Sequence, residues 1–261
     1  MNRRRALITG ASSGIGAATA RLLATSGWQV LAVARRAERL DQLRETPGIE
    51  TMVCDITNDD QVQKMASWVA EHGPLDTLIN NAGAAIGVDT VWDAPLEDWR
   101  DMLELNVLGT KRVISAVLPL LRDAAAERGS ADLLTITSTA GMVSYEGGGG
   151  YNAAKFAERG MVGALRLELA GEPIRVIEIA PGMVKTDEFT LKRTRGNEAW
   201  TEALYRDVDR PLTAEDVALT VKASLDLPSH VNLDLVVVRP VAQAAQHKLH
   251  RGPLVAKREK N

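Results

Sequence analysis

Tyr151 and Lys155 are the two residues whose types and spacing are most suggestive of chemistry. Residues four apart on a helix share one face, so the lysine ammonium can stand beside the tyrosine phenol. A fixed positive charge stabilises the phenolate and lowers the pKa of a phenol from its usual value of about 10. The pair therefore predicts a tyrosine that acts as a general acid or base near neutral pH. The same spacing also fits a buried ring with an exposed lysine, so the rest of the sequence must decide.

A glycine-rich turn near the N-terminus, Thr9 to Gly16, follows a strand-like run and opens a helical pattern. Glycines let the backbone turn tightly and approach a pyrophosphate, and the start of the helix offers free N–H groups. This context predicts a dinucleotide site. Its cofactor-binding residues in the turn are expected to be Gly10, Ser12, Ser13, Gly14, Ile15 and Gly16.

The end of the second expected strand indicates which dinucleotide is bound. An NAD site usually has an acidic residue here for the ribose 2′-hydroxyl, but this chain has Arg35 and Arg36. Guanidinium forks match a phosphate, so the pair predicts NADP. A solvated arginine pair at a helix start is the alternative, made more credible by Arg39. Asp55, followed by Ile56 at the end of the third strand, is expected either to cap backbone or to bind the adenine amino group.

The bulk composition is that of a globular protein, with 261 residues, 45% hydrophobic and 25% charged. A net charge of -3 means that the protein has no overall positive field, so the charge does not favour nucleic-acid binding. Cys54 is the single cysteine, which excludes an intrachain disulfide and favours a reducing, cytoplasmic location; we interpret it as buried packing. No segment reaches the roughly 18 apolar residues of a membrane span. Neither a membrane partner nor a bound metal is expected.

Short apolar runs alternate with helical patterns along the chain, which predicts an α/β fold with a doubly wound parallel sheet of the Rossmann type and helices on both faces. About seven strands are expected, at Ala6–Thr9, Gln29–Ala34, Thr51–Cys54, Thr77–Asn80, Asp132–Thr137, Arg175–Ile179 and Leu235–Val238. Helices are expected at Gly14–Ser26, Ala37–Glu45, Asp59–Glu71, Leu96–Arg122, Tyr151–Ala170 and Ala214–Leu225, the last capped by Thr213 and Asp216.

No repeat or linker divides the chain, so we expect a single domain over residues 1–261. The charged stretch that follows Pro181 and Gly182 lacks strand periodicity, and long irregular segments in compact domains are often lids. We therefore interpret residues 183–212 as a substrate lid. Residues 251–261 are expected to form a flexible tail.

Taken together, these motifs make the chain resemble the short-chain dehydrogenase/reductases over essentially its whole length. The matching residues are Thr9–Gly16, Asn80–Gly83, Asn106, Ser138, Tyr151 with Lys155, and Pro181–Gly182. The resemblance implies that Tyr151 exchanges a proton with the substrate oxygen and that Lys155 holds the nicotinamide ribose. It also implies that Ser138 binds the substrate oxygen and that Asn106 supports a water relay. Further cofactor contacts are implied at Asn81, Ala82, Gly83, Pro181, Gly182, Val184 and Thr186.

Two of these roles have plainer alternatives. Ser138 also fits a loop serine that caps backbone, and Asn106 also fits a polar helix residue satisfied by its neighbours.

A narrower resemblance is to NADP-dependent 3-hydroxy acid dehydrogenases of the serine/allo-threonine type. It rests on Asn80–Gly87, Glu97–Trp99, Pro181–Phe189, Leu212–Val217 and Leu227–Asn232. A carboxylate substrate needs a cation, and Arg193 in the lid is the expected fork, with a solvated lid charge as the alternative. Glu146 and the run Gly147–Gly150 depart from that subgroup and predict an unusually flexible pocket rim, open to a bulkier ketone or aldehyde.

Other functions remain open. A 3-oxoacyl or other ketone reductase of the same family is one; an acidic carrier would need a basic surface, which Arg100, Lys111 and Arg112 supply only thinly. A non-catalytic NADP-binding regulator is another, and the intact Tyr/Lys/Ser/Asn set argues against it. The resemblance also implies a homo-oligomer, a dimer or tetramer, built through Leu96–Arg122 and Tyr151–Ala170, with Leu235–Val241 as a second contact.

Overall fold

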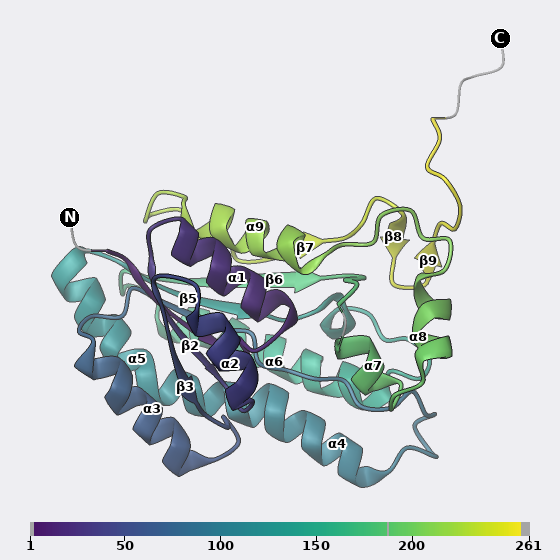
Figure 1. Ribbon diagram of the computed structural model, residues 1–261, viewed down its shortest axis with the longest axis horizontal. Coiled ribbons are helices and arrows are strands. Elements are labelled where there is room, and N and C mark those ends of the chain that lie inside the picture. The colour runs from purple at the N-terminus through teal and green to yellow at the C-terminus, as the bar shows by residue number, and fades with distance from the viewer. Residues whose placement is uncertain (1–2, 187, 257–261) are drawn as a thin grey trace.

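A computed structural model describes residues 3–186 and 188–256. Its centre is a parallel sheet in the order β3-β2-β1-β4-β5-β6-β7, with helices on both faces (Figure 1). This confirms the predicted doubly wound fold. The strands are β1 Arg5–Thr9, β2 Gln29–Ala34, β3 Ile49–Val53, β4 Thr77–Asn80, β5 Ala131–Ile136, β6 Ile174–Pro181 and β7 Val236–Val238.

The central strands are buried on both faces, which explains their continuous Val, Ile and Leu runs. Neighbouring residues point to opposite faces: Leu7 and Leu133 pack with one helical layer, Ile8 and Leu134 with the other. The first layer is α3 (Asp59–Glu71), α5 (Thr110–Arg128) and α6 (Gly149–Glu168); the second is α1 (Gly14–Thr25) and α9 (Ala214–Leu225), with α2 (Ala37–Arg44) beside them. The predicted Thr213/Asp216 capping box opens α9. No helix in the described part of the chain could cross a membrane.

Two expectations about helices were wrong. The single helix expected at Leu96–Arg122 is divided into α4 (Leu96–Leu103), a π-helical turn η1 (Glu104–Gly109) and α5. The segment expected to be irregular contains α7 (Phe189–Arg193) and α8 (Glu198–Tyr205), the latter capped by the Asn197 side chain. Short helices and π turns are stabilised by packing that local sequence patterns do not report.

The glycines before Tyr151, which the sequence predicted to form a flexible rim, are closely packed. Gly149 and Gly150 are the first residues of α6, and they let it approach α4 closely. A Cβ on Gly150 would lie 2.5 Å from Met102 Cε and 3.2 Å from Trp99. Close packing therefore explains why these positions are glycine.

The last described residues belong to a small addition after the sheet. β8 (Gln243–Ala245) and β9 (Lys248–Leu249) pair as an antiparallel hairpin. The Gly252 amide then donates to the Asp207 carbonyl at 2.6 Å, so this part of the expected tail is tied to the lid segment. Residues 257–261 of the predicted tail lie outside the described residues.

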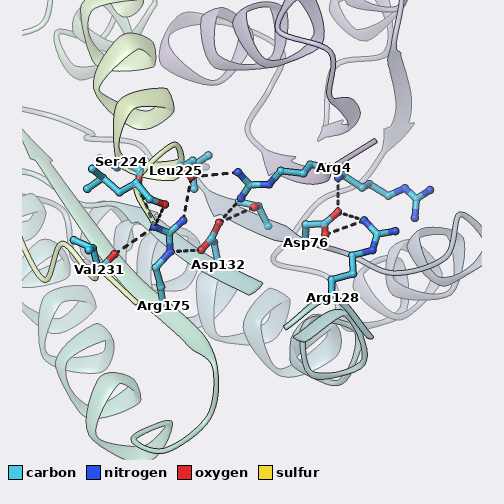
Figure 2. Close-up of polar contacts among 11 residues, drawn as sticks. Arg4, Asp76, Arg128, Asp132, Arg175, Ser224, Leu225 and Val231 are labelled. Carbon is cyan, nitrogen blue, oxygen red and sulfur yellow. Dashed lines mark hydrogen bonds and ion pairs between the residues drawn. The ribbon is translucent and has the colours of Figure 1, made fainter. Parts of the chain in front are cut away.

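An ion network fixes the amino ends of the strands (Figure 2). Arg175 donates from Nε to Asp132 at 2.6 Å, and both side chains are buried. Its other nitrogens donate to the carbonyls of Ser224, Leu225 and Val231, at and beyond the C-terminus of α9. The charged arginine thus satisfies carbonyls that a helix end leaves unpaired. β5, β6 and α9 are held together at the edge opposite the strands' carboxyl ends.

Candidate active site

A cleft of about 1510 Å³ opens at the carboxyl ends of the strands, and residues of α7 and α8, in the segment predicted to be a lid, line it. Ligands of open α/β sheets bind at this edge. Most of the residues predicted for the site line the cleft: Gly10, Ser12, Ser13, Gly14, Ile15, Arg35, Arg36, Asp55, Ile56, Asn81, Ala82, Gly83, Ser138, Tyr151, Lys155, Pro181, Gly182, Val184, Thr186 and Arg193. Gly16 and Asn106 lie behind this lining; a Cβ on Gly16 would reach Asn81.

The glycine turn brings two backbone segments into contact at the floor of the cleft. Gly10 has a φ of +66°, and a Cβ on it would lie 2.8 Å from Ala82 Cα. Asn81 Nδ2 donates to the Thr9 carbonyl at 2.9 Å and joins the two segments. At the start of α1, Ser13 makes no side-chain cap, so the first N–H groups of the helix are available to an anion. The turn fits a pyrophosphate.

Arginines gather at the end of β2 beside this turn. Arg36 donates to the hydroxyls of Ser12 and Ser13 at 2.9 and 2.8 Å. Its Nη1 also pairs with Glu188 of the lid at 2.6 Å. Arg35 lies 3.9 Å from Asp55, so each arginine faces both the cleft and a carboxylate.

Lys192 of α7 adds a third cation to this end of the cleft. Desolvation, together with the charges of Arg35 and Arg36, lowers the pKa of Lys192 below its usual value. Like charges that crowd a lysine in this way favour a bound anion that relieves their repulsion. Arg35, Arg36 and Lys192 therefore fit a phosphate ester such as the 2′-phosphate of NADP.

Tyr151 and Lys155 lie on one face of α6, as their spacing predicted, and both are at least 90% buried. Lys155 Nζ lies 6.0 Å from the centroid of the tyrosine ring. It donates to the Ile136 carbonyl at 3.3 Å and to Glu158 Oε2 at 2.6 Å. Burial is the largest single effect and acts to lower the pKa of Lys155, but Glu158, Tyr151 and Glu178 together outweigh it, and the pKa lies above its usual value. A charged ammonium is therefore fixed beside the phenol.

Ser138 lies just after β5 and is the N-cap of a short 3₁₀ turn, η2 (Thr139–Gly141). Its Oγ accepts the Ala140 amide at 3.1 Å and also lines the cleft. The capping alternative and the substrate-binding role are thus compatible, because a hydroxyl has a donor and two acceptor sites.

Asn106 lies in the π-helical turn and is fully buried. Its Oδ1 accepts the Ala84 amide at 3.2 Å, and its Nδ2 donates to the carbonyls of Ala84 and Met102 at 3.0 and 2.7 Å. The side chain therefore fixes the segment after β4 against the π-helical turn. This agrees with the alternative in which Asn106 is a polar helix residue satisfied by its neighbours.

The two arginines of the lid, Arg193 and Arg195, have different partners. Arg195 also lines the cleft, but it pairs with Asp89 and Asp98 at 3.1 and 2.5 Å. Arg193 lies over the Tyr145 ring, with its guanidinium carbon 5.0 Å from the centroid, and lines the cleft. Of these two charges, only Arg193 is left for a ligand.

Several functional candidates were not predicted. Glu158 follows Lys155 by three residues, a helical spacing that could have revealed it. Glu188 reaches the arginines only through the lid fold, and Tyr145 reaches Arg193 in the same way, so no local signal marks them. The sequence shows Lys192 as a cation of the lid, but its place beside Arg35 and Arg36 depends on the same fold. Cys54 also lines the cleft, but burial raises the pKa of its thiol to about 11, which agrees with a packing role.

Comparisons with known proteins agree with this geometry. The family described as short chain dehydrogenase matches residues 4–196. Sulfoacetaldehyde reductase 2 of Chromohalobacter salexigens is 40% identical over 91% of the chain and 94% of its own length. Serine 3-dehydrogenase of Rhizobium radiobacter is 37% identical with the same coverage. A structure of serine dehydrogenase in a closed form complexed with NADP+ superposes with a TM-score of 0.86 at 34% identity, covering 97% of this chain and 100% of that one. The chain belongs to the short-chain dehydrogenase/reductase family.

Proposed function

We propose that this protein is an NADP(H)-dependent oxidoreductase that interconverts the alcohol and carbonyl forms of a small 3-hydroxy acid. The observation that carries the proposal is the joint position of Tyr151, Lys155 and Ser138 on the lining of one cleft that also contains the glycine turn. The NADP+ complex of the similar serine dehydrogenase supports the cofactor.

Different parts of the cleft are assigned to different parts of the cofactor. Gly10–Gly16 receives the pyrophosphate, and Arg35 and Arg36 receive the 2′-phosphate. Asp55 and Ile56, with Asn81, Ala82 and Gly83, border the adenosine and central part. Pro181, Gly182, Val184 and Thr186 border the nicotinamide part, where Thr186 lies against Gly14.

The bound cofactor supplies or accepts the hydride at its nicotinamide ring. In the oxidation direction, Tyr151 as phenolate takes the hydroxyl proton while the carbon–hydrogen bond gives up its electron pair as hydride. Lys155 stabilises the phenolate by its charge. Ser138 Oγ donates to the substrate oxygen. Asn106, whose side chain binds the backbone of Ala84 and Met102, supports the water relay to Lys155 by holding the segment after β4 in place.

The substrate class follows from Arg193. Its guanidinium lines the cleft over Tyr145, and its buried Nε makes no hydrogen bond within the described residues. A carboxylate would satisfy this fork. Because a relative reduces sulfoacetaldehyde by name, an aldehyde that bears a sulfonate is the second candidate, with the same anion requirement. A neutral ketone or 3-oxoacyl substrate would leave Arg193 unused.

The test follows the absorbance of the reduced nicotinamide. The panel contains L-serine, L-allo-threonine, 3-hydroxyisobutyrate, 3-hydroxybutyrate and neutral secondary alcohols with NADP+, and sulfoacetaldehyde with NADPH. Turnover of an acid that is lost in Tyr151→Phe supports the proposal. Turnover of neutral alcohols alone would support the proposed mechanism but contradict a substrate that bears a carboxylate. A protein that binds NADP+ but turns over nothing in a broad carbonyl panel would instead be a non-catalytic regulator.

A homo-oligomer, either a dimer or a tetramer, is proposed through α4, α5 and α6. These helices expose Leu96, Phe156 and Leu167, which are 64%, 45% and 80% exposed in the single chain. Light scattering after gel filtration distinguishes the states. A cytoplasmic location is proposed from the single buried thiol, Cys54.

A further inference from the structure

Glu158 is a buried carboxylate for which the proposed chemistry has no use. It lies on α6 three residues after Lys155, is 1% exposed, and its Oε2 is 2.6 Å from Lys155 Nζ. Its other oxygen faces Thr110 of α5, whose hydroxyl lies 3.5 Å away. The ion pair is thus enclosed between α6 and α5, behind the cleft.

The neighbouring charges form a closed set. Glu178 of β6 accepts from Arg159 at 2.6 Å and from Thr137 at 2.7 Å. The titratable groups around the Lys155–Glu158 pair are therefore Tyr151, Arg159 and Glu178, and the neutral polar groups include Thr110 and the Ile136 carbonyl. Two cations face two carboxylates. Glu178 is engaged by Arg159 and Thr137, so Glu158 is the carboxylate that directly contacts Lys155.

A buried ion pair contributes little net stability, because desolvation of both ions offsets their attraction. Its effect on Lys155 is more specific. An ammonium has three N–H donors; Glu158 and the Ile136 carbonyl take two, which leaves one for the cleft. The two fixed contacts set the position of the third.

We propose that Glu158 is a positioning residue that keeps Lys155 charged and holds its ammonium in place for catalysis by Tyr151. This inference rests on the proposed function. Glu158 touches neither cleft nor substrate; it acts through Lys155.

The inference predicts a particular pH dependence. Removing a buried negative charge makes every nearby group lose its proton more easily. In Glu158→Gln, the phenolate of Tyr151 and the neutral amine of Lys155 both form at lower pH. A bell-shaped profile of kcat/KM, rising as Tyr151 deprotonates and falling as Lys155 does, should move to lower pH on both limbs by about one unit or more.

The experiment compares the pH profile of NADP+-dependent oxidation in the wild type, Glu158→Asp and Glu158→Gln. We expect both limbs to lie at lower pH in Glu158→Asp than in the wild type, and lower still in Glu158→Gln. Aspartate keeps the negative charge but places it farther from Lys155 Nζ, whereas glutamine removes it. Thr110→Val is the matched control: it removes the neighbouring hydroxyl, keeps the charge, and should leave both limbs in place. If Glu158→Gln does not fold, Glu158→Asp still shifts the profile. Coincident profiles in folded wild-type and variant proteins would overturn the proposal.

A second readout needs neither cofactor nor turnover. The chain has three tyrosines, so phenolate absorbance in each protein minus that of the same protein with Tyr151→Phe isolates Tyr151. We expect its phenolate to form at lower pH in Glu158→Gln than in the wild type, and equal titrations would contradict the role of Glu158. If the wild type lacks turnover, or Tyr151→Phe keeps it, the proposed function fails, while this titration still decides the electrostatic role of Glu158.

Discussion

Glu188 of the lid pairs with Arg36 across the cleft, with Oε2 2.6 Å from Nη1. Its second oxygen lies 3.5 Å from Arg39 Nη2, and both arginines hold the pKa of this carboxyl below its usual value against the effect of burial. The carboxylate of Glu188 is thus already paired with the guanidinium that we propose binds the 2′-phosphate.

Glu188→Gln should therefore strengthen NADP+ binding. The 2′-phosphate competes with the carboxylate for Arg36, and NAD+ lacks that phosphate. We expect affinity for NADP+ to rise about 3- to 10-fold, equivalent to roughly 1 kcal/mol, with little change for NAD+. Isothermal titration measures both. Glu198→Gln, on the exposed start of α8, is the control; equal gains in the two variants would exclude a specific contact.

Arg193→Ala should affect charged substrates selectively. A charge-assisted hydrogen bond contributes about 1.5–3 kcal/mol, so we expect kcat/KM for acids to fall about 10- to 100-fold and that for neutral ketones to change little. Steady-state kinetics on both classes is the measurement. Arg195→Ala is the matched variant, because Arg195 already pairs with Asp89 and Asp98. A parallel loss on acids and ketones would show that Arg193 supports the lid and not the anion.

Arg175→Met should destabilise the fold without altering the cleft. It leaves Asp132 buried with Arg4 and Thr77 as its side-chain partners among the described residues and exposes the α9 carbonyls to an apolar side chain. Loss of one member of a buried pair costs about 3–5 kcal/mol, which calorimetry would record as a lower Tm. Arg122→Met removes an exposed pair with Glu172 and should leave Tm almost unchanged. Equal Tm values for both variants would contradict this account.

Gly141→Ala should separate the loop that contains Ser138 from α6. A Cβ there would lie 2.6 Å from the Lys155 carbonyl oxygen, which is backbone and cannot rotate away. We expect a stability loss of about 1–3 kcal/mol and a lower kcat, measured by denaturant unfolding and turnover. The control is Gly160→Ala. Gly160 lies on α6, and a Cβ there would have nothing within 4 Å, so this change should instead stabilise the protein by about 0.5–1 kcal/mol.

The fold was predictable because the central strands are apolar throughout. β2 and β4 have the bounds that the sequence indicates, since Gln29–Ala34 and Thr77–Asn80 are buried on both faces. α3 and α9 also begin and end as expected, with caps at Asn58 and Thr213. In these segments local pattern and tertiary packing agree.

The unpredicted features depend on contacts between distant segments. The π turn at Asn106 is defined by bonds to Ala84, on the loop after β4. Glu188 meets Arg36 only because α7 folds over the cleft, and the glycines before Tyr151 are explained by Trp99 on α4. For the site, the residue types were readable from the sequence, whereas their partners required the fold.

The π turn also has a consequence for how this helix can vary. A turn of this kind holds one residue more than an α-helical turn, so loss of one residue between Glu104 and Gly109 would restore regular winding. Because the π turn already absorbs the extra residue, the segments on either side would keep their relative rotation, and Met102 and Trp99 would stay against the glycines of α6. Asn106 would instead lose the local geometry that places its side chain against Ala84. We therefore expect a one-residue deletion in this turn to preserve the packing of α4 on α6 and to disturb the contact of Asn106, whereas a deletion inside α5 would rotate its two parts by about 100° relative to each other.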